Sequence, residues 1–485
     1  MSFLSVEFLV GRVVIVSGFF MLLPVILSLL FFESEVYSLI VSSLITVLIG
    51  YSMTLHGKSE GGLTNREAIL TVVGSWLMVS LCGSLPFMFT GVLSPFYSIL
   101  ESISGFTTVG ESLIPDLDVI PKALLLWRNI TQWLGGMGVI VLFVSFLPHY
   151  GTGASNLFNA ELPGPSKEKV LPRISDGASL LWLIYAGMTV FFIILMYLCG
   201  LNAFESIAHG FATISLGGFP IYNDSILRYN SKIVEMLTNI FNILAAGSFY
   251  IYYLVYIRGI KRVFKDAEFR TYLLVIAVFS ILISLSLFFQ GGHDIFYSVY
   301  YGFFQTTQAV TTSGYAITDI SAWPPFCNAI LFIALFIGGC SGSASGGLKI
   351  SRLIVLLQLG WNELNRILHP KVFVRTTMGE KDVSPTVSTA IARYFFLYVA
   401  VYFISTILLT LSGVDLYSSL LIMISMLCTA GTCIPMSMLN NGLTYSAISD
   451  FGKIVMTVCM FLGRLELFTI LVLLRPEFWR KTRNW

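Results

Sequence analysis

Charged residues are scarce in this sequence, and the motifs of the common enzyme classes are missing. Of its 485 residues, 11% are charged and 56% are hydrophobic, whereas a soluble chain carries about a quarter charged residues. The five histidines are scattered, and no HExxH, GxSxG or Walker motif occurs. These absences exclude a soluble protein. They also argue against an enzyme, including an intramembrane hydrolase or a lipid-modifying transferase.

Paired cysteines and a cleavable leader are missing as well. The seven cysteines lie in or beside apolar segments and form no CxxC pair, so neither a zinc site nor a disulfide framework is predicted. The amino end lacks a short apolar region followed by a small-residue cleavage site. We therefore expect its first apolar run to be a retained membrane span.

Long apolar runs are the main feature that the sequence does contain. They are continuous, without the roughly ten-residue alternation of a membrane barrel strand, and each can cross a hydrocarbon core of about 30 Å as a helix. An all-α integral membrane protein is predicted. The ten expected spans are 5–32, 37–54, 68–90, 124–148, 178–200, 233–257, 272–290, 324–357, 386–412 and 447–474.

Basic residues follow the even-numbered spans. Under the positive-inside rule these loops, and with them both termini, are expected in the cytoplasm. The opposite connections carry few basic residues and several acidic ones. The basic residues that orient the chain are Lys58, Arg66, Lys167, Lys169, Arg173, Arg258, Lys261, Arg262, Lys265, Arg270, Arg366, Lys371, Arg375, Lys381, Arg475, Arg480, Lys481 and Arg483.

From the third span onward, each outward connection contains a short apolar piece, at 95–106, 203–212, 296–309 and 416–427. These pieces are too short to span a membrane and have the length of re-entrant helices. Irregular backbone at membrane depth must be buried in protein or line a watery cavity. The four pieces recur at about one-hundred-residue intervals, which predicts four repeats of span, short helix, turn and span.

Each short piece ends in a small-residue turn that contains a glycine. The expected glycines are Gly110, Gly217, Gly314 and Gly431, although Gly218 is also a candidate in the second turn. A helix directs the negative end of its dipole toward such a turn, and glycine permits carbonyl oxygens to face inward. Four turns around one axis form a carbonyl ring that can replace the hydration shell of a monovalent cation. The predicted filter residues are Thr107, Thr108, Val109, Gly110, Ile214, Ser215, Leu216, Gly217, Thr311, Thr312, Ser313, Gly314, Thr429, Ala430 and Gly431.

Two other interpretations of the turns remain open. Their glycines could simply permit close packing of membrane helices. Re-entrant helices also form substrate sites in secondary transporters, but those folds typically contain two inverted repeats, whereas these four repeats share one orientation. A binding-only or structural role would leave the recurrence unexplained, so a cation pore is the favoured interpretation.

The eighth span is interrupted by the sequence GGCSGSASGGLK, from Gly338 to Lys349. Five glycines and three serines in twelve positions disfavour a regular helix, since each glycine costs up to about 1 kcal/mol relative to alanine. A flexible segment here would lie below the filter and could obstruct the pore; a simple kink is the alternative. The predicted gate residues are Gly338, Gly339, Ser341, Gly342, Ser343, Ser345, Gly346, Gly347, Lys349 and Arg464.

Arg464 and Glu466 lie within the last span. A charge at mid-bilayer costs roughly 2.5–3.5 kcal/mol or more, so it usually faces a pore or a partner. Arg464 is predicted as an electrostatic barrier near the interrupted segment, with a structural pair to Glu466 or another acid as the alternative. Glu111 could concentrate cations at the outer mouth, or be an ordinary solvated acid.

Several stretches resemble the Trk/Ktr/HKT superfamily of potassium transporters, and within it the TrkH-type bacterial uptake proteins. They are SGFTTVGES, FATISLGGF, TTSGYA, QWLGGMGVIVL, FIGGCSGSASGGLKISR and GRLELFTILVLL. The resemblance covers nearly the whole chain and implies four membrane-pore-membrane repeats around a pseudo-fourfold pore. The implied divisions are 1–62 for two extra transmembrane helices, then 63–176, 177–270, 271–384 and 385–485 for the repeats.

The resemblance also implies a function and partners. It implies uptake of potassium, and of rubidium, across the bacterial inner membrane, with potassium as cargo and no organic cofactor. It implies a homodimer in membrane lipid, an intramembrane gating loop and a separate cytoplasmic nucleotide-binding regulatory ring (TrkA-like), with no nucleic acid. Glycine at all four turns favours potassium, because serine at the first filter glycine accompanies sodium preference in plant relatives. The fourth turn, Cys428 to Cys433, departs from the family pattern.

Energy supply has two candidate mechanisms. Inward movement of one cation gains about 2.3 kcal/mol per 100 mV of membrane potential. A gated passive conduit is therefore the simplest mechanism, and symport with protons or sodium is the alternative. The basic loops 258–270 and 366–381 are candidate docking surfaces for a regulator, or positive-inside charges alone.

Overall fold

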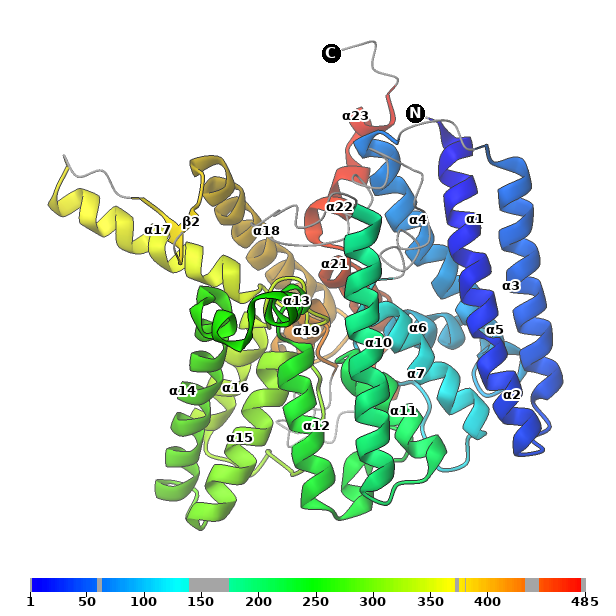
Figure 1. Ribbon diagram of the computed structural model, residues 1–485, viewed down its shortest axis with the longest axis horizontal. Helices are drawn as coiled ribbons and strands as arrows, with labels where there is room; N and C mark the ends of the chain where they lie inside the picture. The colour runs from blue at the N-terminus through cyan, green and yellow to red at the C-terminus, as the bar shows by residue number, and fades with distance from the viewer. Residues whose placement is uncertain are drawn as a thin grey trace.

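The computed structural model describes residues 2–58, 63–138, 174–370, 375–379, 381–431 and 445–480 (Figure 1). The described part is helical except for loops and one antiparallel pair of two-residue strands, β1 (Thr377–Met378) and β2 (Lys381–Asp382). The far end of the predicted span 124–148 lies outside the described residues. So do Thr432, Cys433 and six predicted orienting residues, which are Lys167, Lys169, Arg173, Lys371, Lys481 and Arg483.

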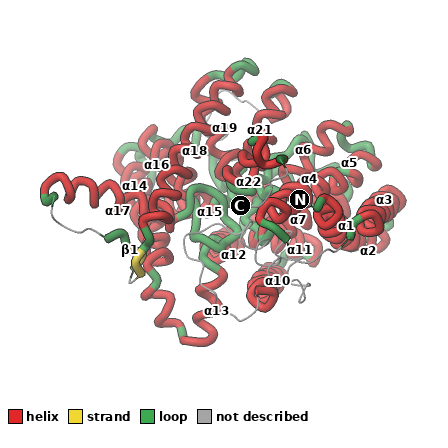
Figure 2. Tube along the Cα trace, turned by 90° about the horizontal axis from the view of Figure 1, so that it is seen from above, coloured by secondary structure: helices red, strands yellow, loops and turns green. Residues whose placement is uncertain are grey.

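Two membrane helices precede the repeats and lie at one side of the molecule (Figure 2). The first is divided into α1 (Phe3–Phe20) and α2 (Leu22–Leu30), and the second is α3 (Val36–His56). Gly11 of α1 and Gly50 of α3 pack so closely that a Cβ on either would lie 2.6 Å from the other's carbonyl oxygen. Small residues of this kind let membrane helices approach closely. Helix α1 also packs against α4 of the first repeat.

Four repeats follow, each made of an outer helix, a short helix and an inner helix. The first contains α4 (Asn65–Gly83), α5 (Leu85–Phe89), α6 (Pro95–Phe106) and α7 (Lys122–Gly136). The second contains α10 (Ile174–Leu198), α11 (Ala203–Ile214), η1 (Ser225–Tyr229), α12 (Lys232–Ala245) and α13 (Phe249–Arg258). After η2 (Ile260–Lys265), the third contains α14 (Ala267–Phe289), α15 (Ile295–Thr311), α16 (Pro325–Ile337) and α17 (Ile350–Leu368). The fourth contains α18 (Pro385–Thr410), α19 (Leu416–Cys428), η3 (Tyr445–Ala447), α21 (Asp450–Arg464), α22 (Leu467–Leu471), η4 (Val472–Leu474) and α23 (Pro476–Trp479).

The four short helices begin in the same way. The residue before each helix is Ser94, Asn202, Asp294 or Asp415, and its side chain accepts a hydrogen bond from a backbone N–H in the first helical turn. Such capping satisfies donors that a helix start leaves free, and it is typically worth about 1 kcal/mol. The local sequence thus fixes where each re-entrant helix starts, close to the predicted positions.

The repeats are arranged in a closed cycle. The inner helix of each repeat packs against the short helix of the next, in the pairs α7 with α11, α12 with α15, α16 with α19, and α21 with α6. The last pair joins the fourth repeat to the first. The predicted fold, four repeats around a pseudo-fourfold axis with two extra helices, is confirmed (Figure 2).

The predicted break in the eighth span is present, between the end of α16 and the start of α17. Two sharp bends within expected spans were not predicted. The span expected at 233–257 bends by 85° between α12 and α13, and that at 447–474 bends by 114° between α21 and α22. Gly247 and Ser248 stand at the first bend, and Glu466, with φ of +62°, stands at the second. Within the described residues, six helices are long and apolar enough to span a membrane, or eight if each bent pair counts as one span.

Candidate functional site

The turns that follow the four short helices have one backbone conformation. Each contains a non-glycine residue in the left-handed region and, two positions later, a glycine with positive φ. The first set is Thr108, Leu216, Thr312 and Thr429, with φ of 59°, 57°, 61° and 55°, and the second is Gly110, Gly218, Gly314 and Gly431, with φ of 78°, 69°, 78° and 65°. Left-handed backbone is uncommon outside glycine, so its recurrence at four matched non-glycine positions indicates one conserved geometry.

One hydrogen bond closes each turn onto its short helix. The residue before each of these glycines donates its N–H to the carbonyl of a residue near the helix end. The bonds run from Val109 to Ser104 (3.1 Å), Gly217 to Ala212 (3.1 Å), Ser313 to Gln308 (3.2 Å) and Ala430 to Ser425 (2.9 Å). The pattern is the Schellman type that ends many helices.

This pattern corrects the predicted register of the second turn by one residue. Gly218 is the counterpart of Gly110, whereas Gly217 is the counterpart of Val109 and supplies the carbonyl next to the glycine. Ile214, which was predicted as a filter residue, is the last residue of α11. The sequence offered two adjacent glycines, and only the helix-end hydrogen bond selects between them.

The four turns contact one another in a closed ring. A Cβ built on each glycine would collide with the carbonyl oxygen of the adjacent turn. The pairs are Gly110 with Gly217 O (2.0 Å), Gly218 with Ser313 O (2.1 Å), Gly314 with Ala430 O (2.3 Å) and Gly431 with Val109 O (2.6 Å). Glycine is therefore needed at each turn for close approach as well as for its φ. The cycle visits all four repeats and returns to the first.

Buried amide side chains hold neighbouring turns in place. Gln132 of α7 donates to Gly217 O at 2.8 Å and accepts from Phe219 N at 3.0 Å, so the first inner helix grips the second turn. Asn242 of α12 likewise donates to Gln308 Oε1 at 2.9 Å and to Ser313 Oγ at 3.1 Å. Neither amide was predicted from the sequence, although polar side chains within apolar spans are a readable signal of a functional or structural role.

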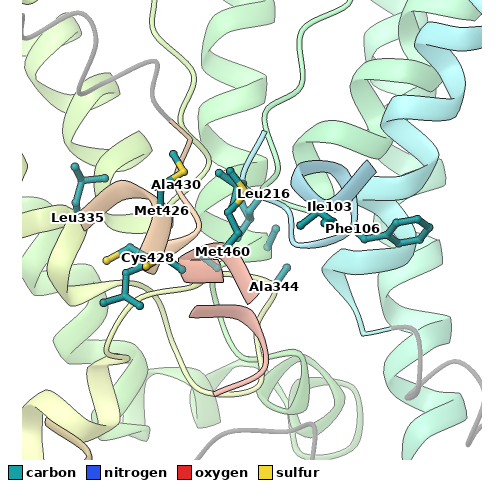
Figure 3. Close-up of a cluster of buried hydrophobic side chains, with 14 of the residues drawn as sticks. Ile103, Phe106, Leu216, Leu335, Ala344, Met426, Cys428, Ala430 and Met460 are labelled. Atoms are coloured by element: carbon teal, nitrogen blue, oxygen red, sulfur yellow. The ribbon is translucent and has the colours of Figure 1, made fainter. Parts of the chain in front are cut away.

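The fourth turn was expected to be the least regular. Within the described residues its backbone matches the other three, in the φ values of Thr429 and Gly431 and in the closing hydrogen bond of Ala430. Tyr398 of α18 reaches Cys428 Sγ at 3.0 Å. Figure 3 shows Leu216 and Ala430, from the second and fourth turns, gathered with Met460 in one buried cluster.

The segment 338–349 forms a loop with several positive φ values. Gly338, Gly342 and Gly347 have φ of 73°, 72° and 77°, and Lys349 has φ of 77°. The predicted glycine-rich interruption is thus a non-helical connection rather than a kink, because glycine readily adopts this backbone. Lys349 is the strained member, and its ammonium donates to the carbonyl of Ser345.

This loop is attached to the ring at the end where the short helices stop. The hydroxyls of Ser345 and Thr312 lie 3.1 Å apart, and Gly346 N donates to Thr312 Oγ1 at 3.0 Å. A Cβ on Gly346 would lie 2.0 Å from Cys428 O. The loop therefore contacts the third and fourth turns directly, and nothing larger than glycine fits at position 346.

The loop also reaches the second repeat. Cys340 N donates to Ala246 O at 2.9 Å, and Phe249 N donates to Gly342 O at 3.2 Å. The carboxylate of Glu268, at the start of α14, accepts from Ser341 N at 2.6 Å. These bonds hold the loop beside the unpredicted bend between α12 and α13.

Arg464 joins the loop to the first repeat. Its guanidinium donates to Ala344 O of the loop at 2.9 Å and to Gly136 O at the end of α7 at 2.7 Å. Glu466, the acid considered as its alternative partner, is bonded to Arg352 of α17. Arg464 thus lies where the sequence placed it, beside the interrupted segment.

Two titratable side chains near the first and second turns, His209 and Glu111, are buried. His209 is buried within α11, and its Nε2 hydrogen-bonds the Tyr229 hydroxyl at 3.1 Å. Glu111 follows the first turn and is only 7% exposed, so it is not a freely solvated acid.

A closed ring of four re-entrant turns inside a bundle of long apolar helices defines a multi-pass membrane protein of the four-repeat class. The family model TrkH, described as a cation transport protein, matches residues 38–481. The chain belongs to this family.

Named relatives agree over the full length. The chain is 34% identical to the Trk system potassium uptake protein TrkH of Halomonas elongata and 33% identical to that of Escherichia coli K12. Each alignment covers 99% of this chain and 100% of the relative. The crystal structure of the potassium transporter TrkH from Vibrio parahaemolyticus superposes with a TM-score of 0.89 at 30% identity, covering 99% of this chain and 100% of that one.

Proposed function

We propose that this chain mediates potassium-selective uptake, with rubidium also accepted, across the bacterial inner membrane. The observation that carries the proposal is the closed ring of four matched turns, each at the C-terminal end of a short helix. Helix C-termini carry about half a negative charge each, and backbone carbonyls can replace the water around a potassium ion. The names of the relatives support potassium as the cargo.

The carbonyls of the turns, rather than their side chains, would coordinate the ion. This explains why the turns differ in sequence, as in Thr107-Thr108-Val109-Gly110 and Cys428-Thr429-Ala430-Gly431, while their backbone is the same. Buried amide side chains such as Gln132, which hydrogen-bond to the backbone of a turn, would keep the carbonyls at the spacing that potassium needs. Selectivity for potassium would then depend on the buried side chains that hold the turns as well as on the turns themselves.

Loop 338–349 would act as the gate, because it contacts two turns and is tied to the other two repeats. Arg464 would add a positive charge at the blocked end of the conduit. Deleting part of 341–347 is expected to raise rubidium flux into proteoliposomes. Lower flux from a folded variant would contradict an obstructing role for the loop.

We further propose a homodimer and a cytoplasmic nucleotide-binding regulatory ring as partners. Helix α17 extends away from the bundle (Figure 1) and exposes one apolar stripe, formed by Leu357, Trp361, Leu364 and Leu368. Contiguous exposed apolar side chains of this kind are a candidate protein–protein contact. The regulatory ring would open the gate by moving the helices that are joined to the loop. Helix α17 is one of them, because it directly follows the loop in the chain.

Voltage-clamped bilayers containing the purified protein separate the passive conduit from symport. The passive mechanism predicts a reversal potential set by the potassium gradient alone, at equal pH and without sodium. Adding a proton or sodium gradient should then leave the reversal potential unchanged. A shift that follows either added gradient would establish coupling and overturn the passive mechanism. Absence of any potassium or rubidium current or uptake would overturn the proposed function.

A further inference from the structure

A buried ion pair lies behind the first two turns of the ring. Arg128 Nε of α7 donates to Glu101 Oε1 of α6 at 2.9 Å, and both side chains have no exposed surface. Two charges at membrane depth persist only when they are paired and further hydrogen-bonded, because desolvation is expensive. Neither residue was singled out from the sequence, and neither belongs to the ring or to the loop.

Glu101 holds the segment that leaves the first turn. Besides Arg128, its carboxylate accepts from Leu113 N at 2.7 Å and from Ser112 Oγ at 3.0 Å. These two residues follow Gly110 closely. The carboxylate therefore fixes the segment that follows the first turn against α6, the short helix that precedes this turn.

Arg128 holds the corresponding segment of the second turn. Its Nη1 donates to Pro220 O at 3.1 Å, and its guanidinium carbon lies 4.1 Å from the centre of the Phe219 ring. Phe219 and Pro220 follow Gly218 directly. The planar guanidinium of Arg128 thus donates through Nε to Glu101, which holds the first turn, and through Nη1 to Pro220 O, which follows the second turn.

The pair exists in one quarter of the ring. The helix-end hydrogen bonds align Ser104 with Ala212, Gln308 and Ser425. The same alignment places His209, Gln305 and Ile422 at the position of Glu101. None of these is a carboxylate, so the charged connection is specific to the junction of the first and second turns.

We propose that Glu101 and Arg128 are a positioning pair that sets the separation of the first and second turns and thereby discrimination against sodium. The inference rests on the proposed function of the ring as a potassium filter. A sodium ion is smaller, so carbonyls must move inward to dehydrate it. A pair anchored to both outgoing segments opposes that movement, and its loss lets the ring contract.

The test uses Glu101→Gln and Arg128→Lys, which change charge or geometry while keeping most of the volume. Rubidium and sodium fluxes are compared in proteoliposomes with wild type. Each variant is expected to lower the rubidium-to-sodium ratio about tenfold, the size expected when one charge-assisted hydrogen bond is lost. Glu235→Gln is the matched control, because Glu235 is a buried acid on α12 that pairs with Lys232 and Tyr300.

Ser112→Ala covers the case in which the charge variants do not fold, since it removes one hydrogen bond to Glu101 and leaves both charges in place. It should shift the ratio in the same direction by a smaller amount. An unchanged ratio in the folded variants overturns the proposal, as does an equal shift in Glu235→Gln. If wild type itself does not discriminate against sodium, the failure lies with the proposed filter and not with the pair alone.

Discussion

At the scale of single residues, the ring requires glycine at four positions because there is no room for a Cβ atom. Each of the four glycines lies against a backbone carbonyl of the next turn, at 2.0 to 2.6 Å from where a Cβ would be. A carbonyl cannot rotate away as a side chain can, so any other residue must displace the ring itself. The glycines were predicted from their recurrence, but this contact was not, because it joins residues from different repeats that lie about one hundred or more positions apart.

Gly110→Ser is expected to reduce discrimination against sodium by about tenfold, or about 1.4 kcal/mol. The new Cβ would press on Gly217 O and move a carbonyl of the adjacent turn. The measurement is rubidium uptake with sodium as competitor. Gly91→Ser is the matched control, because Gly91 also has positive φ, 71°, but has no atom within 4 Å of a built Cβ. Similar selectivity in both variants would refute the filter role of this turn.

Arg464→Gln is expected to raise resting rubidium flux about tenfold, or about 1.4 kcal/mol. The substitution removes the positive charge beside the loop and weakens its bonds to Ala344 and Gly136. Arg464→Lys keeps the charge and should stay near wild type in the same liposome assay. Equal flux increases in both variants would show that the hydrogen bonds matter and the charge does not.

At the scale of elements, the short helices were the most predictable part. Their capping residues and apolar lengths are local, and α6 coincides with the predicted 95–106. The bends after α12 and α21 were missed because one or two residues, Gly247 with Ser248 and Glu466, do not outweigh a long apolar run. The bend after α12 also hydrogen-bonds to the loop, through Ala246 O and Phe249 N, and periodicity cannot register such tertiary contacts.

Ser345→Ala is expected to raise resting flux severalfold, because the Ser345 hydroxyl contacts Thr312 in the third turn and accepts from Gly339 N at 2.9 Å. Ser343→Ala, in the same loop, is the control, since among the described residues the Ser343 hydroxyl bonds locally, to Cys340 O at 2.6 Å. Liposome flux without any regulator measures both. If Ser343→Ala opens the conduit as much as Ser345→Ala, general loop loosening explains the effect instead.

At the scale of the whole molecule, the closed cycle of inner and short helices makes the four repeats one unit. The sequence predicted this arrangement from the repeat period, and the packing of α21 on α6 completes it. Buried polar residues such as Gln132 and Asn242 bind the cycle together. They were missed because an amide in an apolar span gives no indication of its partner.

Trp361→Glu combined with Leu364→Glu is expected to separate the proposed homodimer, because each replaces an apolar side chain on the exposed stripe of α17. The mass of the detergent-solubilised protein, measured by light scattering, should fall by half after subtraction of the micelle. Glu363→Ala, on another face of α17, should leave the mass unchanged. A dimeric double variant would place the contact elsewhere.

All four quarters of the ring are encoded once, in a single chain. A substitution in a symmetric tetramer is imposed at four places together, whereas here it changes one place and spares three. Mutations can therefore adjust the ring in small increments, and the quarters can diverge in sequence without losing the shared backbone. The same holds for closure as proposed above, because loop 338–349 occurs once, against the third and fourth turns, and its opening would need no agreement among subunits.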